Sequence, residues 1–170
     1  MKSRRAEARD LNAINTLIAH ARSAIAELGI DQWQDGYPEP DLIARDIEQG
    51  IGYVFESDGQ IASYMVPLTD PEPIYDTIDG KWLVEGKPYL TVHRMAIDDA
   101  FRGTGLSKAM FAFAEEYARS LGMPSLRADT HRGNVRMRRL MERCGFVYCG
   151  DVEYEVTAGD PIRVAYEKIL

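Results

Sequence analysis

Two glycines separated by one residue stand where a strand-like stretch gives way to a helix-like stretch. They are Gly103 and Gly105, in the segment Arg102-Gly-Thr-Gly-Leu-Ser107. Glycine has no Cβ atom and readily takes positive φ angles, so such a backbone can approach a ligand closely. Successive N–H groups of the loop, together with the unpaired donors of the following helical turn, form a site for an anion. The chemistry predicted here is phosphate binding, and a diphosphate suits the site.

Two common phosphate loops do not fit this spacing. A P-loop needs two glycines separated by four residues and then Lys-Ser/Thr, which residues 102–108 do not supply. A dinucleotide-binding fingerprint needs a third glycine at position 108, where this sequence has Lys108. A plain glycine turn that opens a helix remains the structural alternative.

The residues on either side predict how the loop is held. Before it, residues 90–97 contain Val, Thr and Ile, and their apolar and polar side chains alternate in part, as they do in a strand. After it, apolar residues recur at helical spacing: Leu106, Met110, Phe113, Ala114, Tyr117, Ala118 and Leu121. The predicted unit is therefore a strand, a glycine loop and a helix.

The rest of the chain reads as alternating helices and strands. We expect a charged strand at 2–8, a helix at 11–28 capped by Asp10, and a second helix capped by Asp41 that ends at Gly50. Asn134 is predicted to cap a helix that closes at Gly145. Further strands are expected at 51–56, 60–68, 82–84, 123–130, 146–149, 152–156 and 162–167.

Composition narrows the class of protein. The chain has 170 residues, 45% of them hydrophobic and 28% charged, which predicts one soluble domain over 1–170 in the cytoplasm. No apolar run approaches a membrane span. The net charge of −7 argues against nucleic-acid binding and agrees with a cationic acceptor such as an amine. Cys144 and Cys149 form no CxxC pair, so neither a disulfide nor a metal site is expected.

Two motifs in order resemble a known family. The loop approaches the pattern Arg/Gln-x-x-Gly-x-Gly/Ala, with Ser107 at the last place, and residues 134–146 give Asn, a helix and Gly-Phe. Both are similar to segments of the GCN5-related N-acetyltransferases (GNAT), and the element order matches across nearly the whole chain. The resemblance implies the GNAT fold, an α/β (α+β) class with a mixed sheet of about six to seven strands flanked by about four helices.

The resemblance also implies acetyl-coenzyme A as co-substrate and assigns residues to it. The end of the strand would contact the pantetheine arm through backbone groups, with one N–H polarising the thioester carbonyl: Met95, Ala96 and Ile97. The loop would hold the pyrophosphate: Arg102, Gly103, Thr104, Gly105, Leu106 and Ser107. Asn134 would reach the pantetheine or adenylate region. Arg136, Arg139 and Arg143 share one helical face, which reads better as a solvated basic face than as a cofactor contact.

The implied activity is transfer of an acetyl group to a primary amine of a small molecule or protein, by direct attack in a ternary complex. His93 could accept the amine's proton, or could simply be a packed strand residue. Many family members carry a tyrosine at the place of Met141 that protonates the leaving thiolate, and methionine cannot do so. Tyr148, Cys144 or water are the alternatives. Met141 also keeps open a second hypothesis, a non-catalytic acyl-coenzyme A sensor.

A stiff loop with aromatic rings follows the first predicted helix. Trp33, Gln34 and Tyr37 lie in it beside two prolines, and we expect them to line the acceptor site or else to cover the helix. The sequence does not identify the acceptor. The final alternating hairpin could pair across a homodimer.

Overall fold

The computed structural model describes residues 2–156 and 159–170. Its strands form one eight-stranded sheet in the order β1-β2-β3-β5-β6-β8-β7-β4. The strands are β1 (Lys2–Arg5), β2 (Tyr53–Ser57), β3 (Gln60–Leu68), β4 (Asp79–Gly80), β5 (Leu90–Ile97), β6 (Ser125–His131), β7 (Val147–Glu153) and β8 (Ile162–Ile169). The α-helices in these ranges are α1 (Leu11–Ala26), α2 (Pro40–Glu48), α3 (Leu106–Ser120) and α4 (Val135–Arg143). The expected mixed fold is confirmed. The sheet has eight strands, more than the six to seven expected, and one of them, β4, is only two residues long.

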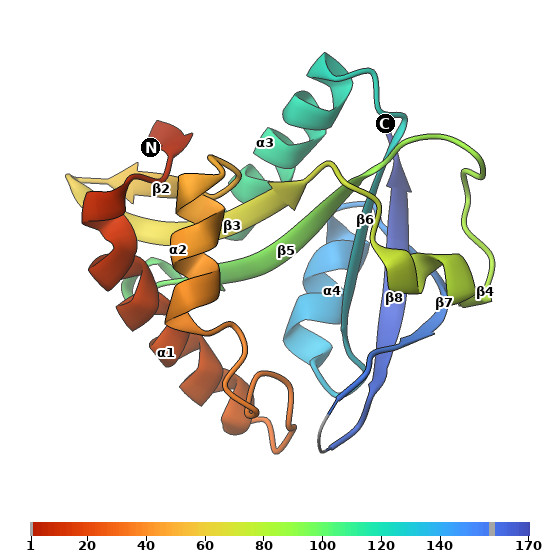
Figure 1. Ribbon diagram of the computed structural model, residues 1–170, viewed down its shortest axis with the longest axis horizontal. Coiled ribbons are helices and arrows are strands. Elements are labelled where there is room, and N and C mark those ends of the chain that lie inside the picture. The colour runs from red at the N-terminus through yellow and green to blue at the C-terminus, as the bar shows by residue number, and fades with distance from the viewer. Residues whose placement is uncertain (1, 157–158) are drawn as a thin grey trace.

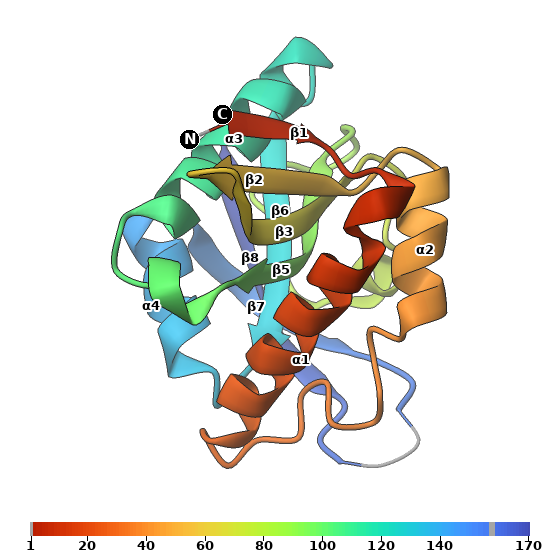
Figure 2. The same ribbon diagram turned by 90° about the vertical axis from the view of Figure 1, so that its left-hand side faces the viewer.

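Each face of the sheet buries its own apolar cluster (Figures 1 and 2). Helices α1 and α2 cover one face of β2, β3 and β5, where Ile14, Ile18 and Ile43 pack on Tyr64 and Val66. Helices α3 and α4 cover the opposite face with a second cluster that includes Met110, Phe111, Leu126, Met141 and Phe146. The helical stripe predicted after the glycine loop is the buried side of α3, which explains why that segment folds as a helix.

Strands β5 and β6 are parallel neighbours that pair only at one end (Figure 1). Their register contains Leu90 with Leu126 and Thr91 with Arg127, and beyond Thr91 the two strands diverge. A β-bulge adds to this opening, because His93 pairs with Val66 and Ala96 with Tyr64 on β3, so that two residues of β5 oppose one. The backbone groups of β5 that face β6 after Thr91 therefore have no ladder partner in the described structure.

Two predicted helix caps differ in the structure. Asp10 occupies the N-cap position of α1, but its carboxylate does not cap that helix; it accepts hydrogen bonds from the Glu7 N–H (2.8 Å) and from the Arg4 guanidinium (2.6 and 3.0 Å). Helix α2 begins at Pro40, before Asp41, because the fixed φ of proline at the first helical position starts the helix earlier. The predicted cap at Asn134 is confirmed, since its side chain accepts from the Met137 N–H at 3.2 Å.

The strands predicted at 146–149 and 152–156 are one strand, β7, which stays paired with β8 through a register shift between Tyr148 and Gly150. Gly150 has φ 151°, and a Cβ atom there would collide with the backbone of Asp79 on β4. Glycine at position 150 thus allows the backbones of β7 and β4 to approach closely. In the sequence, the same glycine looked like the end of one strand and the start of another. Part of the predicted hairpin turn, 157–158, lies outside the described residues.

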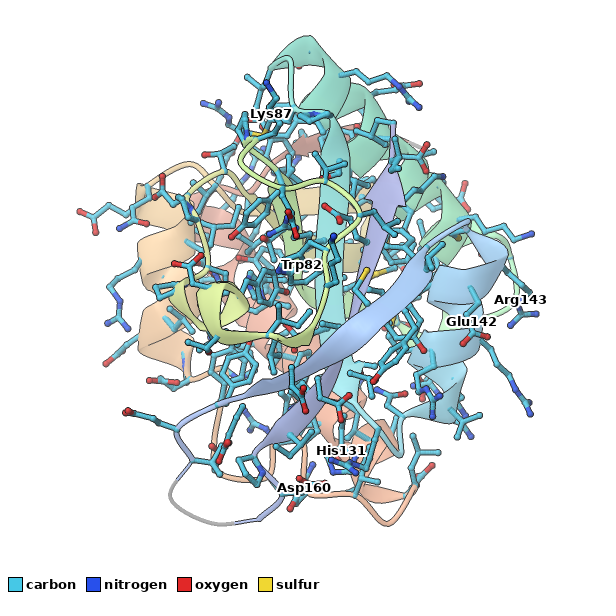
Figure 3. All side chains as sticks on the ribbon, turned by 90° about the vertical axis from the view of Figure 1, so that its right-hand side faces the viewer. Trp82, Lys87, His131, Glu142, Arg143 and Asp160 are labelled. Carbon is cyan, nitrogen blue, oxygen red and sulfur yellow. The ribbon has the colours of Figure 1, made fainter. Side chains whose placement is uncertain are left out.

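The strand predicted at 82–84 is absent because its backbone N–H groups have a different partner. The segment 69–89 crosses the face of the sheet formed by β6, β8 and β7 (Figure 3). In it, the N–H groups of Leu83 and Val84 donate to the carboxylate of Glu167, at 2.6 and 3.1 Å. The Arg127 guanidinium donates to the other Glu167 oxygen at 3.0 Å and lies between the rings of Trp82 and Tyr89. Glu167 therefore fastens this segment to the sheet.

We expect Glu167→Ala to lower the free energy of unfolding by about 3–5 kcal/mol, because it leaves the buried Arg127 charge and two N–H groups unpaired. Glu167 is fully buried, so solvent cannot replace it. Glu153→Ala, an exposed residue of β7, should change the same quantity by no more than about 0.5 kcal/mol. Denaturant unfolding measures both. A Glu167 variant as stable as the Glu153 control would contradict this role.

Candidate active site

The glycine loop presents an open backbone. The carboxylate of Asp98 accepts from the Ala100 N–H at 2.9 Å and caps the 3₁₀ turn Asp99–Phe101 that precedes it. Gly103 and Gly105 have φ angles of 79° and 87°, and a Cβ atom built on either meets nothing within 4 Å. Among the described residues, their N–H groups have no hydrogen-bond partner. Free donors at the start of α3 are the arrangement that binds an anion.

A cavity of about 480 Å³ lies beside this loop, between α1, the end of β5 and α4; we call it the glycine-loop cavity. It brings together most of the residues predicted for the cofactor, namely Met95, Ala96, Ile97, Arg102, Gly103, Leu106, Ser107 and Asn134. Thr104 and Gly105 belong to the loop without lining the cavity, and the Thr104 hydroxyl donates back to the Phe101 carbonyl at 2.7 Å. Arg102 pairs with Asp99 at 2.6 Å.

The three arginines predicted to share a face of α4 differ in their positions relative to the cavity. Arg136 lines the glycine-loop cavity, whereas Arg139 and Arg143 do not. All three are exposed, and Figure 3 shows Arg143 directed away from the body of the protein. The interpretation as a mainly solvated basic face agrees with this arrangement.

A second cavity of about 380 Å³, called the central cavity, occupies the mouth of the opening between β5 and β6. It shares Ile25, Met95, Asn134 and Met137 with the glycine-loop cavity, so the two cavities adjoin at these residues. Its walls come from both faces of the sheet. Phe111 and Met141 belong to the side of α3 and α4, and His93, Asp129 and Arg163 belong to the other face. A ligand that enters beside the glycine loop can thus meet one that enters from the opposite face.

Two acidic arrangements stand on the polar side of the central cavity. The His93 Nε2 atom lies 3.0 Å from a carboxylate oxygen of Glu72, on the segment 69–89. Asp129 accepts hydrogen bonds from the hydroxyls of Tyr75 (2.7 Å) and Tyr154 (3.0 Å). Burial raises the pKa of Asp129, while nearby His93 and the two hydroxyls oppose that rise. Burial and the adjacent carboxylate raise the pKa of both tyrosines, which therefore stay protonated donors.

The bulged residue Arg94 anchors the loop between α1 and α2. It has φ 52°, and its guanidinium contacts the buried carboxylate of Asp46 at 2.8 and 2.9 Å. It also donates to the Tyr37 hydroxyl at 3.1 Å, which holds this loop over the cavity. Burial raises the pKa of Asp46, and the Arg94 charge opposes that effect. The charge of Arg94 is thus fully occupied by a structural partner.

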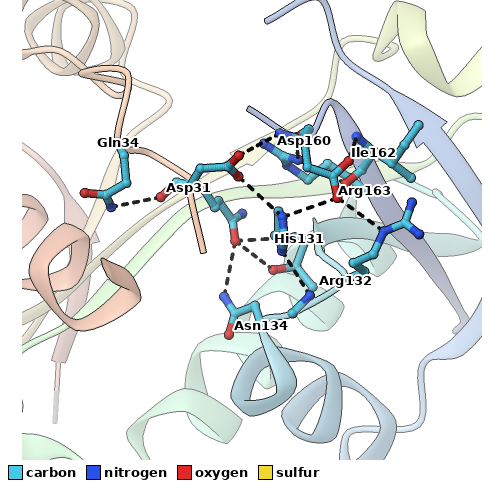
Figure 4. A network of polar contacts seen from close by, with 11 residues as sticks. Asp31, Gln34, His131, Arg132, Asn134, Asp160, Ile162 and Arg163 are labelled. Atoms are coloured by element: carbon cyan, nitrogen blue, oxygen red, sulfur yellow. Dashed lines mark hydrogen bonds and ion pairs between the residues drawn. The ribbon is translucent and has the colours of Figure 1, made fainter. Parts of the chain in front are cut away.

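A polar network closes the other side of the same loop (Figure 4). The Gln32 amide oxygen accepts from Thr130 Oγ1, the His131 N–H and Asn134 Nδ2, each at 3.3 Å. The Gly133 N–H donates to His131 Nδ1, so a neutral ring carries its proton on Nε2, 3.4 Å from Asp31. Burial and the Arg163 charge lower the pKa of His131. The network joins the α1–α2 loop to α4 and to the β7–β8 connection.

The structure brings most of the predicted catalytic and acceptor residues together. His93, Trp33, Gln34 and Tyr37 all line the central cavity. Tyr148 does not: it is 53% exposed on β7 and donates to Asp151 at 2.9 Å. Met141, at the place of the family tyrosine, is fully buried and lines the cavity with a side chain that carries no proton to give.

Sequence reasoning missed Glu72, Tyr154 and Arg163 at this site. Each joins it through tertiary contacts, and none stands in a motif that would have marked it.

The described residues hold no group of three or more His, Cys, Asp or Glu side chains able to bind a metal ion. None of the helices in the described ranges is both long and apolar enough to pass through a membrane.

Comparisons with known proteins agree with this geometry. Residues 14–146 match the model of the acetyltransferase (GNAT) family. A GNAT-family acetyltransferase from Streptococcus agalactiae 2603 is 39% identical with a TM-score of 0.87, and the match covers 99% of this chain and 95% of that one. One from Listeria monocytogenes 4b F2365 is 27% identical with a TM-score of 0.74, covering 99% and 94%. No protein in the curated set matches.

A more distant structure contains the cofactor. It is a putative streptothricin acetyltransferase from Bacillus anthracis in complex with acetyl coenzyme A, 20% identical with a TM-score of 0.55 over 70% of this chain and 61% of that one. At this identity it shows a shared fold alone. From the family match and the Streptococcus relative, this chain belongs to the GNAT family of acetyltransferases, which use acetyl-coenzyme A.

Proposed function

We propose that the protein transfers the acetyl group of acetyl-coenzyme A to a primary amine of a small molecule or protein, by direct attack in a ternary complex. The observation that carries this proposal is the meeting of the two cavities at Met95 and Asn134. The glycine loop stands on one side of that junction and the His93–Glu72 pair on the other. Acetyl-coenzyme A supplies a thioester, an acyl group already activated for transfer.

The residues of the glycine-loop cavity fit this cofactor. The free N–H groups of Gly103 and Gly105 would bind the pyrophosphate, with the positive end of α3 behind them. The unpaired edge of β5 from Met95 to Ile97 offers backbone groups to the amides of the pantetheine arm. One N–H at the bulge would polarise the thioester carbonyl. Asn134 caps the start of α4 and lines the cavity in which the pantetheine arm would lie.

The acceptor amine would enter through the central cavity, between Trp33, Gln34 and Tyr37. An amine attacks only in its neutral form, and His93 is placed to take its proton directly or through a water. Glu72 holds the imidazole at 3.0 Å and stabilises its charged form once the proton has moved. His93 and Met95 lie on the same bulged stretch of β5, so the base and the polarising backbone are positioned by one element.

The cysteines support direct attack over an acyl-enzyme. Neither Cys144 nor Cys149 lines either cavity, and burial raises the pKa of both thiols, which disfavours the nucleophilic thiolate. We assign the proton of the leaving thiolate to solvent water, because Met141 has none to give and Tyr148 lies elsewhere. Loss of a general acid typically costs 10²- to 10⁴-fold, so we expect a slow enzyme.

Release of coenzyme A in the presence of pooled primary amines tests the proposal. We expect steady release that depends on both the amine and acetyl-coenzyme A, with intersecting double-reciprocal lines, as a ternary complex requires. Acetyl-coenzyme A without amine is the control. Binding without amine-dependent release would favour the acyl-coenzyme A sensor, the alternative that Met141 suggests. Parallel lines would contradict direct attack.

A further inference from the structure

We propose that the acceptor is a small amine that also carries a carboxylate, as an amino acid does, and that Arg163 in the central cavity binds that carboxylate. This rests on the proposed acetyl transfer and adds a substrate class to it.

Arg163 is a buried cation with unused donors. It lies on β8, lines the central cavity and is only 9% exposed. Its Nη1 atom donates to the backbone carbonyls of Asp160 and Ile162, at 2.6 and 3.0 Å (Figure 4). Within the described ranges, Nε and Nη2 have no hydrogen-bond partner, yet neither is sealed from solvent. Two guanidinium nitrogens, with three N–H groups between them, thus remain for a ligand.

The other well-buried arginines of the described residues show what this position lacks. Arg94 pairs with Asp46, and Arg127 pairs with Glu167, each through a carboxylate within 3.0 Å. No carboxylate of the described chain lies within 4.0 Å of the Arg163 nitrogens. A buried charge without a counter-ion is costly, and a guanidinium matches a carboxylate geometrically. An anion brought by a ligand would supply the missing partner.

The carboxylate of Asp129 lies at a distance from Arg163 that suits the amine and carboxylate of one amino acid. Asp129 faces Ala165 across the β6–β8 ladder, and Arg163 is two residues further along β8. At about 3.3 Å per residue, the two side chains start roughly 7 Å apart on the same face of the sheet. A ligand between them would present its amine toward Asp129 and His93 and its carboxylate toward Arg163. The rings of Trp33 and Tyr154 would contact what lies between.

The alternative is that the acidic side chains around the cavity select a cationic amine that carries no carboxylate. One carboxylate oxygen of Asp31 accepts from the Asp160 N–H at 2.6 Å, and the other lies 3.4 Å from His131 Nε2 without a hydrogen bond, so Asp31 is held in the polar network of the loop. Glu155 and Asp35 are exposed at the rim. At the buried end of the cavity the charges are therefore mixed, which fits an amine that carries its own anion better than a polyamine.

Calorimetric titration with product analogues tests the anion site without requiring turnover. The probes are the N-acetyl forms of the proteinogenic L-amino acids, each compared with its N-acetyl carboxamide, in the presence of coenzyme A. One or more acids should bind about 10- to 100-fold more tightly than the matching amide, the range for a charge-assisted pair. Arg163→Met should remove that difference, and Arg163→Lys should restore part of it. Arg132→Met, an exposed arginine outside the cavity, should leave it unchanged.

The free amino acids and their amides, used as acceptors, separate this inference from the proposed activity. If amines are acetylated but acids and amides are equal in kcat/KM and in binding, the carboxylate site is refuted and the acetyltransferase stands. If no amine is acetylated but the N-acetyl acids bind in an Arg163-dependent way, the site stands and the proposed activity falls. A difference between acid and amide that persists in Arg163→Met also refutes the assignment.

Discussion

Replacing Gly105 with glutamate is expected to weaken acetyl-coenzyme A binding at least about 100-fold. The new carboxylate would stand where the diphosphate is bound, and the residue would have to hold a φ of 87° that side chains rarely adopt. Loss of two charge-assisted hydrogen bonds alone accounts for this factor, at about 1.5–3 kcal/mol each. Titration calorimetry measures the change in Kd.

The matched control for this change is Gly122→Glu. Gly122 has a φ of 70°, a built Cβ atom meets nothing within 4 Å, and it lies beyond the far end of α3. It introduces the same charge and similar backbone strain away from the loop. Cofactor binding should survive in Gly122→Glu and fail in Gly105→Glu. Equal affinities in the two variants would mean that the glycine loop is only a turn.

The second large effect is expected at His93. His93→Gln removes the proton acceptor while keeping a polar side chain of similar size, so kcat should fall by about 10²- to 10⁴-fold with little change in cofactor Kd. Steady-state kinetics and calorimetric titration of the cofactor measure these two quantities.

Two comparisons make the His93 result specific. Glu72→Gln, which keeps the shape of the partner, should lower kcat less than His93→Gln because the base remains. His20→Gln, on an exposed position of α1 outside both cavities, should have no effect on kcat. A His93→Gln enzyme with wild-type kcat would show that His93 is a packed strand residue and that Asp129 or water takes the proton.

The parts of the structure that follow from the sequence are those set by local pattern. The change of period around Gly103 and Gly105 predicted a strand, an open loop and a helix, and the structure contains β5, that loop and α3. The Asn134 cap was readable because Asn accepts hydrogen bonds at a helix start and few other residues do so well. The turn between the strands predicted at 51–56 and 60–68 is also set locally, since Asp58 and Gly59 both have positive φ.

The parts that do not follow are those set by partners distant in the chain. Trp82 to Val84 has the composition of a strand, but Glu167, more than eighty positions later, takes its N–H groups. Glu72 reaches His93 only because the segment 69–89 folds across the sheet. Arg163 stands in a predicted strand with no motif around it, and only the position of β8 beside β6 places it at the cavity. Local propensity contains none of this information.

The opening between β5 and β6 was also beyond the sequence. The bulge at Arg94, which adds to this opening, has a positive φ, and its guanidinium forms a salt bridge to Asp46 on α2. That contact makes the backbone conformation of β5 depend on α2, which lies far earlier in the chain. The family resemblance implied a cofactor path at Met95 to Ile97, and the structure adds the physical reason: the edge of β5 facing β6 is left without a ladder partner there.

The proposed function depends above all on the glycine loop and the open edge of β5 acting as one binding site for acetyl-coenzyme A. The most direct measurement is titration calorimetry of acetyl-coenzyme A into the unaltered protein, the reference for the Gly105 variant. We predict one site per chain with saturable binding at micromolar to sub-millimolar concentration. No detectable heat, and no rise in melting temperature at millimolar acetyl-coenzyme A, would contradict the account, because any ligand that binds the native state must stabilise it.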